Sequence, residues 1–119
     1  MYNNKLSATD VLENANFDAE NRTVTIHTIN TDKEDIFTEF KISEEAQREV
    51  LKAFENAKFE KITSLNPVDY DYRITISLNR GYPMYLDSTK KSLTLIDTKE
   101  NYTIINETDL FDILKKATK

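Results

Sequence analysis

Length, composition and charge indicate one folded domain and exclude several classes of protein. The chain has 119 residues, of which 39% are hydrophobic and 31% charged, ordinary values for a single domain that buries about two-thirds of its unfolded surface. It contains no cysteine and one glycine, which excludes disulfides, cysteine-ligated zinc and glycine-rich phosphate loops. No apolar run is long enough to insert this segment into a membrane.

The net charge of −5 is concentrated in the first half of the chain. Residues 1–60 carry seven basic and thirteen acidic side chains, and residues 61–119 carry nine and eight. Nucleic-acid binding rewards clustered Lys and Arg, so it is not expected here. An acidic half could instead occupy a basic site on another protein, although local pairs such as Glu44 with Arg48 favour an ordinary solvated helix.

The first 21 residues give little structural signal. Residues 1–10 have the composition of a tail, and residues 11–17 fit either a short strand or a helical turn. The start MYNNKLSATD has no apolar core of a signal peptide. The chain therefore fits a cytoplasmic protein, or one whose export signal or lipid anchor lay upstream.

Two alternating segments predict a first hairpin. Residues 22–30 (RTVTIHTIN) and 36–42 (IFTEFKI) alternate and are rich in β-branched residues. The expected pairs are Ile26 with Phe40, Val24 with Ile42 and Ile29 with Phe37.

Residues 43–58 (SEEAQREVLKAFENAK) predict an amphipathic helix. Ser43 is placed to cap its N-terminus, and Glu44 and Glu45 lie in the first turn. Its apolar stripe is Ala46, Val50, Ala53, Phe54 and Ala57.

One interrupted strand, four further strands and a second helix are expected. Phe59 and Ile62 suggest a strand that Asn66 and Pro67 interrupt. Residues 72–79 alternate, and a loop of residues 80–82 with Gly81 in the left-handed conformation would pair Leu78 with Met84 and Ile76 with Leu86. Residues 92–97 and 102–106 predict a hairpin that pairs Leu95 with Ile104. Residues 107–117 predict a helix with Asn106 or Thr108 as its cap and a stripe of Leu110, Ile113, Leu114 and Ala117.

Together these elements predict a two-layer α+β domain over residues 22–117, with amphipathic helices on a twisted antiparallel sheet. This order resembles the helix-on-sheet layout of TATA-binding-protein-like or cystatin-like domains. The segment YRITISLNRGYPMYLDSTKKSLTLIDTKENYTIINETDLFDIL resembles the uncharacterised C-terminal domains of small exported lipoproteins of low-GC Gram-positive bacteria. That resemblance implies an extracellular or cell-surface location, with the cytoplasm as the alternative, and brings no known activity.

The candidate chemistry is sparse. His27 is the only histidine, and with no cysteine it lacks the partners of a zinc site or a nucleophile relay. Asp69 and Asp71 could contribute to a calcium site, but the glycine and the glutamate of an EF-hand loop are missing. Residues 88–91 match S-x-x-K without the helix that the motif needs. We therefore predict no catalytic activity, no metal and no cofactor.

The aromatic residues give the one positive functional signal. Tyr70, Tyr82 and Tyr85 are predicted on loops or on the sheet face away from the helix, where tyrosine favours recognition. The candidate binding residues are Tyr70, Tyr82, Tyr85, Arg80, Ile96 and Ile105. They predict a non-catalytic recognition or accessory domain with a protein partner. The alternative is an acidic inhibitor or immunity protein that occupies a basic site on an enzyme or toxin, and the oligomeric state is left open.

Overall fold

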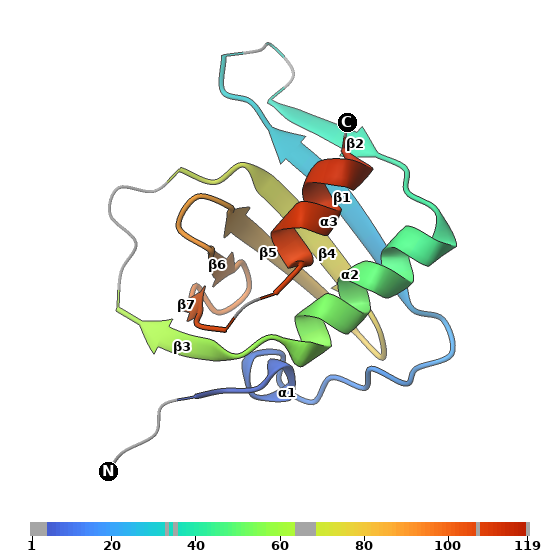
Figure 1. Cartoon of the computed structure of the whole chain (residues 1–119), viewed down its shortest axis with the longest axis vertical. Helices are drawn as coiled ribbons and strands as arrows, with labels where there is room; N and C mark the ends of the chain where they lie inside the picture. Colours follow the sequence, from blue (N-terminus) through green and yellow to red (C-terminus); the bar gives the residue numbers. More distant parts are fainter. Residues whose placement is uncertain (1–4, 33, 35, 64–68, 107, 119) are drawn as a thin grey trace.

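The computed structural model describes residues 5–32, 34, 36–63, 69–106 and 108–118. Within them, one open antiparallel sheet has seven strands in the order β2-β1-β4-β5-β6-β7-β3. The strands are β1 (Thr23–Ile29), β2 (Phe37–Phe40), β3 (Phe59–Ile62), β4 (Tyr72–Ser77), β5 (Gly81–Asp87), β6 (Ser92–Leu95) and β7 (Asn101–Ile104). The helices are α1 (Ala8–Val11), α2 (Glu44–Asn56) and α3 (Leu110–Ala117). The α+β class and the antiparallel sheet are confirmed, and α2 and α3 cross one face of the sheet (Figure 1).

The helix α2 forms as its sequence pattern predicts. Ser43 Oγ accepts a hydrogen bond of 3.1 Å from the amide of Ala46, which caps the N-terminus. Val50, Leu51 and Phe54 are buried against the sheet and its neighbours. In the part of the chain that the structure describes, no helix combines the length and the apolar character needed to cross a membrane.

The register of the first hairpin is confirmed, and those of the two later hairpins are not. Ile26 pairs with Phe40 and Ile29 with Phe37. In the β4–β5 hairpin, however, Ile76 pairs with Tyr82 and Ile74 with Met84. The turn is therefore residues 78–80. Gly81 is the first residue of β5, and its φ is not positive.

The side chain of Asn79 gives a physical reason for this earlier turn. Its Oδ1 accepts a hydrogen bond of 2.9 Å from the amide of Asn16, and its Nδ2 donates one of 2.9 Å to the carbonyl of Asn14. The turn is thus tied to a segment more than sixty residues away in sequence. The change of register is an even number of residues, so the inward faces are the predicted ones.

The β6–β7 hairpin also turns earlier than predicted. Leu93 pairs with Tyr102, and Leu95 does not form its predicted pair with Ile104. Lys99 adopts the left-handed conformation with φ of 62°, and its amide donates to the carbonyl of Leu95 at 2.8 Å. A lysine thus adopts the left-handed backbone conformation that glycine or asparagine usually adopts in a turn.

The last helix begins three residues later than predicted, at Leu110. Thr108 Oγ1 accepts from the amide of Leu110 at 3.3 Å, so this candidate cap does bind the helix start. Asn106, the other candidate, serves α2 instead. Its side chain accepts from the amide of Lys58 at 2.7 Å and donates to the carbonyl of Asn56 at 3.3 Å.

The N-terminal segment packs on the domain, so its assignment as a tail is wrong from Leu6 onward. Leu6 forms a β-bridge with Phe59, and the buried side chains of this segment are Ala8, Val11, Leu12 and Phe17. Phe17 stacks on Phe54 with ring centroids 6.5 Å apart. Residues 6–17 therefore close one end of the core between the sheet and α2. The predicted break at Asn66 and Pro67 lies outside the described residues.

Candidate functional site

The candidate site is the face of the sheet opposite α2 and α3, called the outer face below. Strand pairing aligns one residue from each strand in a central row across it. In spatial order the central row is Glu39, His27, Arg73, Tyr85, Thr94, Asn101 and Ile62. Since side chains alternate along a strand, these residues point away from the core.

A pair of stacked tyrosines occupies the middle of the outer face. The rings of Tyr70 and Tyr85 lie 5.1 Å apart at an interplanar angle of 18°. The hydroxyls of Tyr70 and Thr94 share a hydrogen bond, and Thr94 Oγ1 donates to Asn101 Oδ1 at 2.6 Å. The two predicted site residues Tyr70 and Tyr85 are thus brought together on the predicted face.

A second aromatic group lies toward the β2 edge. The guanidinium of Arg73 lies 5.9 Å from the centroid of the Phe37 ring, and the His27 ring meets Phe37 edge-on at 6.5 Å. His27 Nε2 is 3.5 Å from Glu39 Oε1, so this histidine is paired with a neighbouring side chain. Phe37 still exposes 43% of its surface.

The two aspartates weighed as calcium ligands do not combine into a site. Asp69 is exposed, whereas both carboxylate oxygens of Asp71 accept hydrogen bonds from the amide and the hydroxyl of Ser88. The nearby Asp87 is buried, and its Oδ1 accepts the amides of Thr89 and Lys90. Among the described residues, no three His, Cys, Asp or Glu side chains are grouped as metal ligands.

Tyr82 and Arg80 lie on the helix side, which corrects their predicted place in a recognition loop of residues 80–82. Because β5 begins at Gly81, alternation turns Tyr82 inward with Met84, and its side chain is only 7% exposed. The Tyr82 hydroxyl donates to the carbonyl of Glu13 at 2.8 Å, and the Arg80 guanidinium lies 5.4 Å from the Tyr82 ring centroid.

These two residues line a cavity of about 270 Å³ beside α1. Val11, Leu95 and Tyr102 contribute to its walls, and Asp10, Glu13, Asp97 and Glu100 are among the acidic residues that line it. Burial raises the pKa values of the Tyr82 and Tyr102 hydroxyls above their ordinary range.

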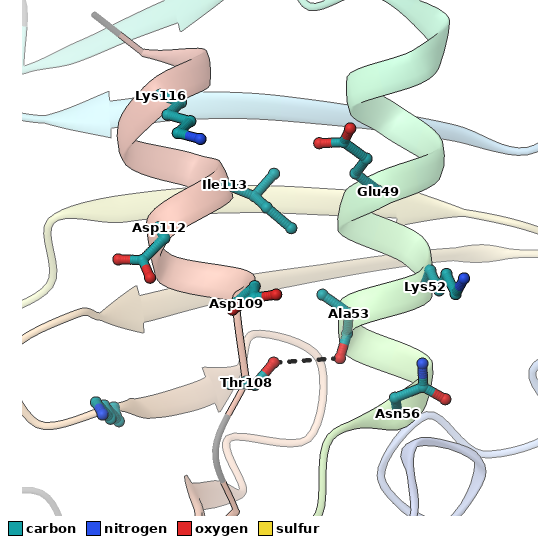
Figure 2. Close-up of a pocket in the computed structure, with 10 residues that line it drawn as sticks. Glu49, Lys52, Ala53, Asn56, Thr108, Asp109, Asp112, Ile113 and Lys116 are labelled. Atoms are coloured by element: carbon teal, nitrogen blue, oxygen red, sulfur yellow. Dashed lines mark hydrogen bonds between the residues drawn. The ribbon is translucent and has the colours of Figure 1, made fainter.

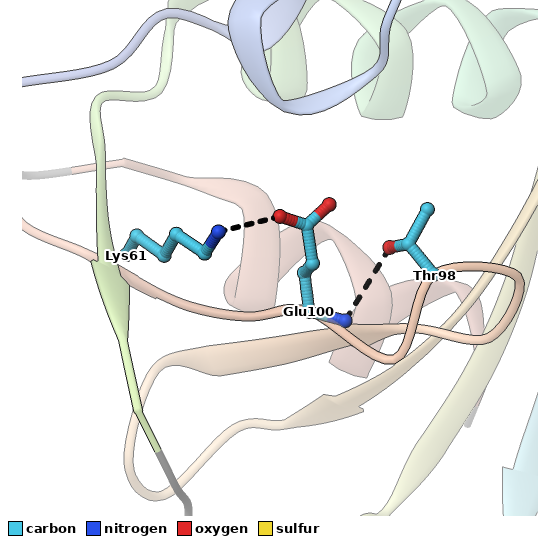
Figure 3. A network of polar contacts seen from close by, with 3 residues as sticks. All are labelled: Lys61, Thr98 and Glu100. Carbon is cyan, nitrogen blue, oxygen red and sulfur yellow. Dashed lines mark hydrogen bonds and ion pairs between the residues drawn. The ribbon is translucent and has the colours of Figure 1, made fainter.

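One of these carboxylates is already held by an ion pair. Figure 3 shows Lys61 Nζ of β3 against Glu100 Oε2, 2.7 Å apart, and the amide of Glu100 bonded to Thr98 Oγ1. The hydrogen bond within this pair lowers the pKa of Glu100 and raises that of Lys61. The pair links edge strand β3 to the turn between β6 and β7.

A larger groove of about 1060 Å³ runs between α2 and α3. Its lining is polar and of both charge signs, with Glu49 and Lys116 facing across it (Figure 2). The hydroxyl of Thr108 donates to the carbonyl of Ala53 at one end. Sequence analysis missed this groove because it arises where two helices distant in sequence lie side by side.

The two isoleucines of the predicted site lie near the margins of the sheet. Ile96 is half-buried just beyond β6, and its amide donates to the carbonyl of Pro83 at 3.1 Å. Ile105 follows β7, donates its amide to the carbonyl of Lys58 at 2.9 Å, and is 40% exposed. The structure therefore separates the six predicted residues into the Tyr70–Tyr85 pair, the Arg80–Tyr82 pair and two isoleucines.

Comparison of the chain with family models, with curated proteins and with solved structures finds no match.

Proposed function

We propose that this is a non-catalytic recognition or accessory domain that binds a protein partner through its outer face. The observation that carries the proposal is the ordered aromatic surface formed by the Tyr70–Tyr85 stack and by Phe37 with Arg73. Tyrosine, phenylalanine and arginine are the residues enriched in protein interfaces. Their rings are already held by stacking and hydrogen bonds, so binding would lose little side-chain entropy.

The charge distribution also favours a protein partner for this face. The chain has a net charge of −5, but the central row carries Glu39 and Arg73, whose charges cancel. The centres of interfaces are depleted of charged residues other than arginine, and this row has only these two side chains of fixed charge. The groove and the Tyr82 cavity both lie on the helix side, whereas the described residues of the outer face offer the side-chain area that a protein partner can contact.

Site-specific photo-crosslinking in the natural host tests this proposal. A photoreactive amino acid at Tyr85 should capture a defined protein, and the same probe at the exposed Glu55 of α2 should not. Tyr85→Glu should abolish binding of the captured protein, while Tyr85→Phe, which keeps the ring, should retain it. Both variants should melt within about 1 kcal/mol of the parent protein, as surface substitutions usually do.

Equal capture from Tyr85 and Glu55 would contradict recognition through the outer face. Unfolding of Tyr85→Glu would show instead that the stacked tyrosines support the fold.

The location and the finer fold are part of the same proposal. The resemblance to exported lipoprotein domains of Gram-positive bacteria supports an extracellular or cell-surface domain, and fractionation of the host distinguishes this from a cytoplasmic one. Helices on one face of an antiparallel sheet support a layout like that of TATA-binding-protein-like or cystatin-like domains.

A specific observation keeps the inhibitor or immunity alternative in view. The first turn of α2 exposes Glu44 and Glu45, with Glu49 and Glu55 also exposed further along the helix. Such a surface would bind a basic site, and its affinity would fall steeply with salt. Binding to the outer face would change little with salt, so the affinity at low and high ionic strength separates the two functions.

A further inference from the structure

The two edges of the sheet are closed to different extents. Edge strand β3 is partly covered by the N-terminal segment, because Leu6 and Phe59 exchange two backbone hydrogen bonds of 2.8 Å. It also carries the exposed Lys61, a residue type that discourages pairing at sheet edges. In the described part of the chain, edge strand β2 pairs with β1 alone and leaves its other side open.

The hydrogen-bond pattern shows which backbone groups face this open side. The amide of Asn30 bonds the carbonyl of Ile36, whereas the amide of Ile29 bonds the carbonyl of Asp71, ahead of β4. Even-numbered residues of β1 therefore bond toward β2, and in an antiparallel ladder their partners on β2 are even-numbered too. The N–H and C=O groups of Phe37 and Glu39 consequently point toward the open edge.

The side chains of this edge expose unusual apolar area. Ile36 and Phe37 are each 43% exposed, and they are two of the three large hydrophobic residues exposed in the described chain. Single exposed apolar residues are normal on a protein surface. Two adjacent exposed apolar residues beside unpaired backbone groups are instead typical of a surface that pairs with another strand.

We infer that β2 pairs with β2 of a second copy of this chain, antiparallel and centred on Thr38. Phe37 then lies opposite Glu39 of the second copy, so the outward backbone groups of each copy meet those of the other as hydrogen-bonded pairs. Ile36 lies opposite Phe40 of the second copy, which covers exposed apolar surface with a half-buried ring.

Charge favours this register over the neighbouring one that is centred on Glu39. A pairing centred on Glu39 would place two carboxylates directly opposite each other, and like charges in that position destabilise a sheet. The Thr38-centred pairing has no such contact along β2. It joins the two sheets into one and places the two outer faces side by side.

The net charge of −5 on each copy sets the salt dependence of this association. Two like-charged copies repel each other, and salt screens that repulsion. Self-association through β2 should therefore strengthen as salt is added. This inference does not rest on the proposed partner-binding function. It shares Phe37 with that surface, but it uses the backbone edge of β2 rather than the Tyr70–Tyr85 stack.

A matched pair of variants tests the inference by sedimentation equilibrium. From about 10 µM to about 1 mM protein, the parent chain should rise from the monomer mass of 13.9 kDa toward twice that value, at lower concentration in high salt. Glu39→Pro removes an outward N–H that β1 does not use, so it should stay monomeric. Glu39→Ala loses the same side chain but keeps the N–H, so it should associate like the parent.

Backbone amide exchange provides a second measurement that does not depend on a proline variant. In the parent chain, the amides of Phe37 and Glu39 should become at least about tenfold more protected at high concentration, while Thr38, already bonded to β1, should change little. A monomer at all concentrations, equal association of Glu39→Pro and Glu39→Ala, or unchanged exchange at Phe37 and Glu39 would each overturn the inference.

Discussion

At the scale of single residues, Tyr82 shows what decides the face on which a side chain lies. The sequence places Met84 and Leu86 on the inward face by alternation, and Tyr82 has the same parity. The expected loop of residues 80–82 nevertheless excludes Tyr82 from that alternation. Because β5 already begins at Gly81, Tyr82 is a core residue whose hydroxyl reaches the carbonyl of Glu13.

The burial of Tyr82 predicts a loss of stability in alkali. Its pKa in the folded state lies above the ordinary value of 10.0, first because of desolvation. The Tyr82 hydroxyl therefore ionises at lower pH in the unfolded chain than in the folded one. Its contribution to the free energy of unfolding is complete below pH 10 and falls as the pH rises past that value. Tyr82→Phe should show a shallower fall, measured by denaturant unfolding between about pH 8 and about pH 11.

Tyr85→Phe is the control for this experiment, because Tyr85 lies on the half-exposed outer face. Like Tyr82→Phe, it removes one hydroxyl and keeps the ring. Equal slopes for the parent and Tyr82→Phe would contradict the buried, un-ionised state of this hydroxyl.

At the scale of elements, alternation and helical periodicity were sufficient where the structure is locally determined. Ser43 and the apolar stripe define α2, and the pairing of Ile26 with Phe40 follows from the strand pattern alone. The turns were not predictable in the same way. Asn79 fixes one turn through a hydrogen bond to the distant backbone of Asn16, and Lys99 adopts the left-handed conformation in the other. Local propensity indicates neither feature.

The central position of α2 gives a direct stability prediction. Phe54 is fully buried, with its ring centroid 6.5 Å from that of Phe17 and 5.1 Å from that of Phe59. Phe54→Ala should reduce the free energy of unfolding by about 3–5 kcal/mol, because it removes buried area and leaves a cavity. The exposed neighbour substitution Glu55→Ala should change it by less than about 0.5 kcal/mol in the same denaturant melts.

A small effect of Phe54→Ala, similar to that of Glu55→Ala, would contradict the packing of α2 on the sheet.

At the scale of the whole molecule, the N-terminal segment is the main difference between the sequence-based domain and the folded one. Its helix α1 has four residues, too few to show a helical period. The contacts that attach it are long-range, from Leu6 to Phe59 and from Asn16 to Asn79. A single sequence contains no local signal for such contacts. For the same reason the sequence places Tyr70 and Tyr85 correctly but not Tyr82 and Arg80.

Substitution of Leu12 tests whether this segment belongs to the domain. Leu12 is fully buried, so Leu12→Ala should lower the free energy of unfolding by about 2–5 kcal/mol. Glu13→Ala keeps the carbonyl that Tyr82 uses and removes only an exposed side chain. It should change stability by less than about 0.5 kcal/mol in urea unfolding. Near-zero effects of both variants would restore the assignment of this segment as a tail.

The place of β4 between β1 and β5 determines when a growing chain can fold during synthesis. Thr23 at the start of β1 pairs with Ser77 at the end of β4, so β1, β2 and α2 leave the ribosome well before their sheet is complete. Their apolar faces stay partly uncovered until β4 is synthesised, because its pairing with β1 closes a loop of roughly fifty residues. Residues 1–60 carry the acidic excess of the chain, and like charge disfavours the association of such incompletely folded chains.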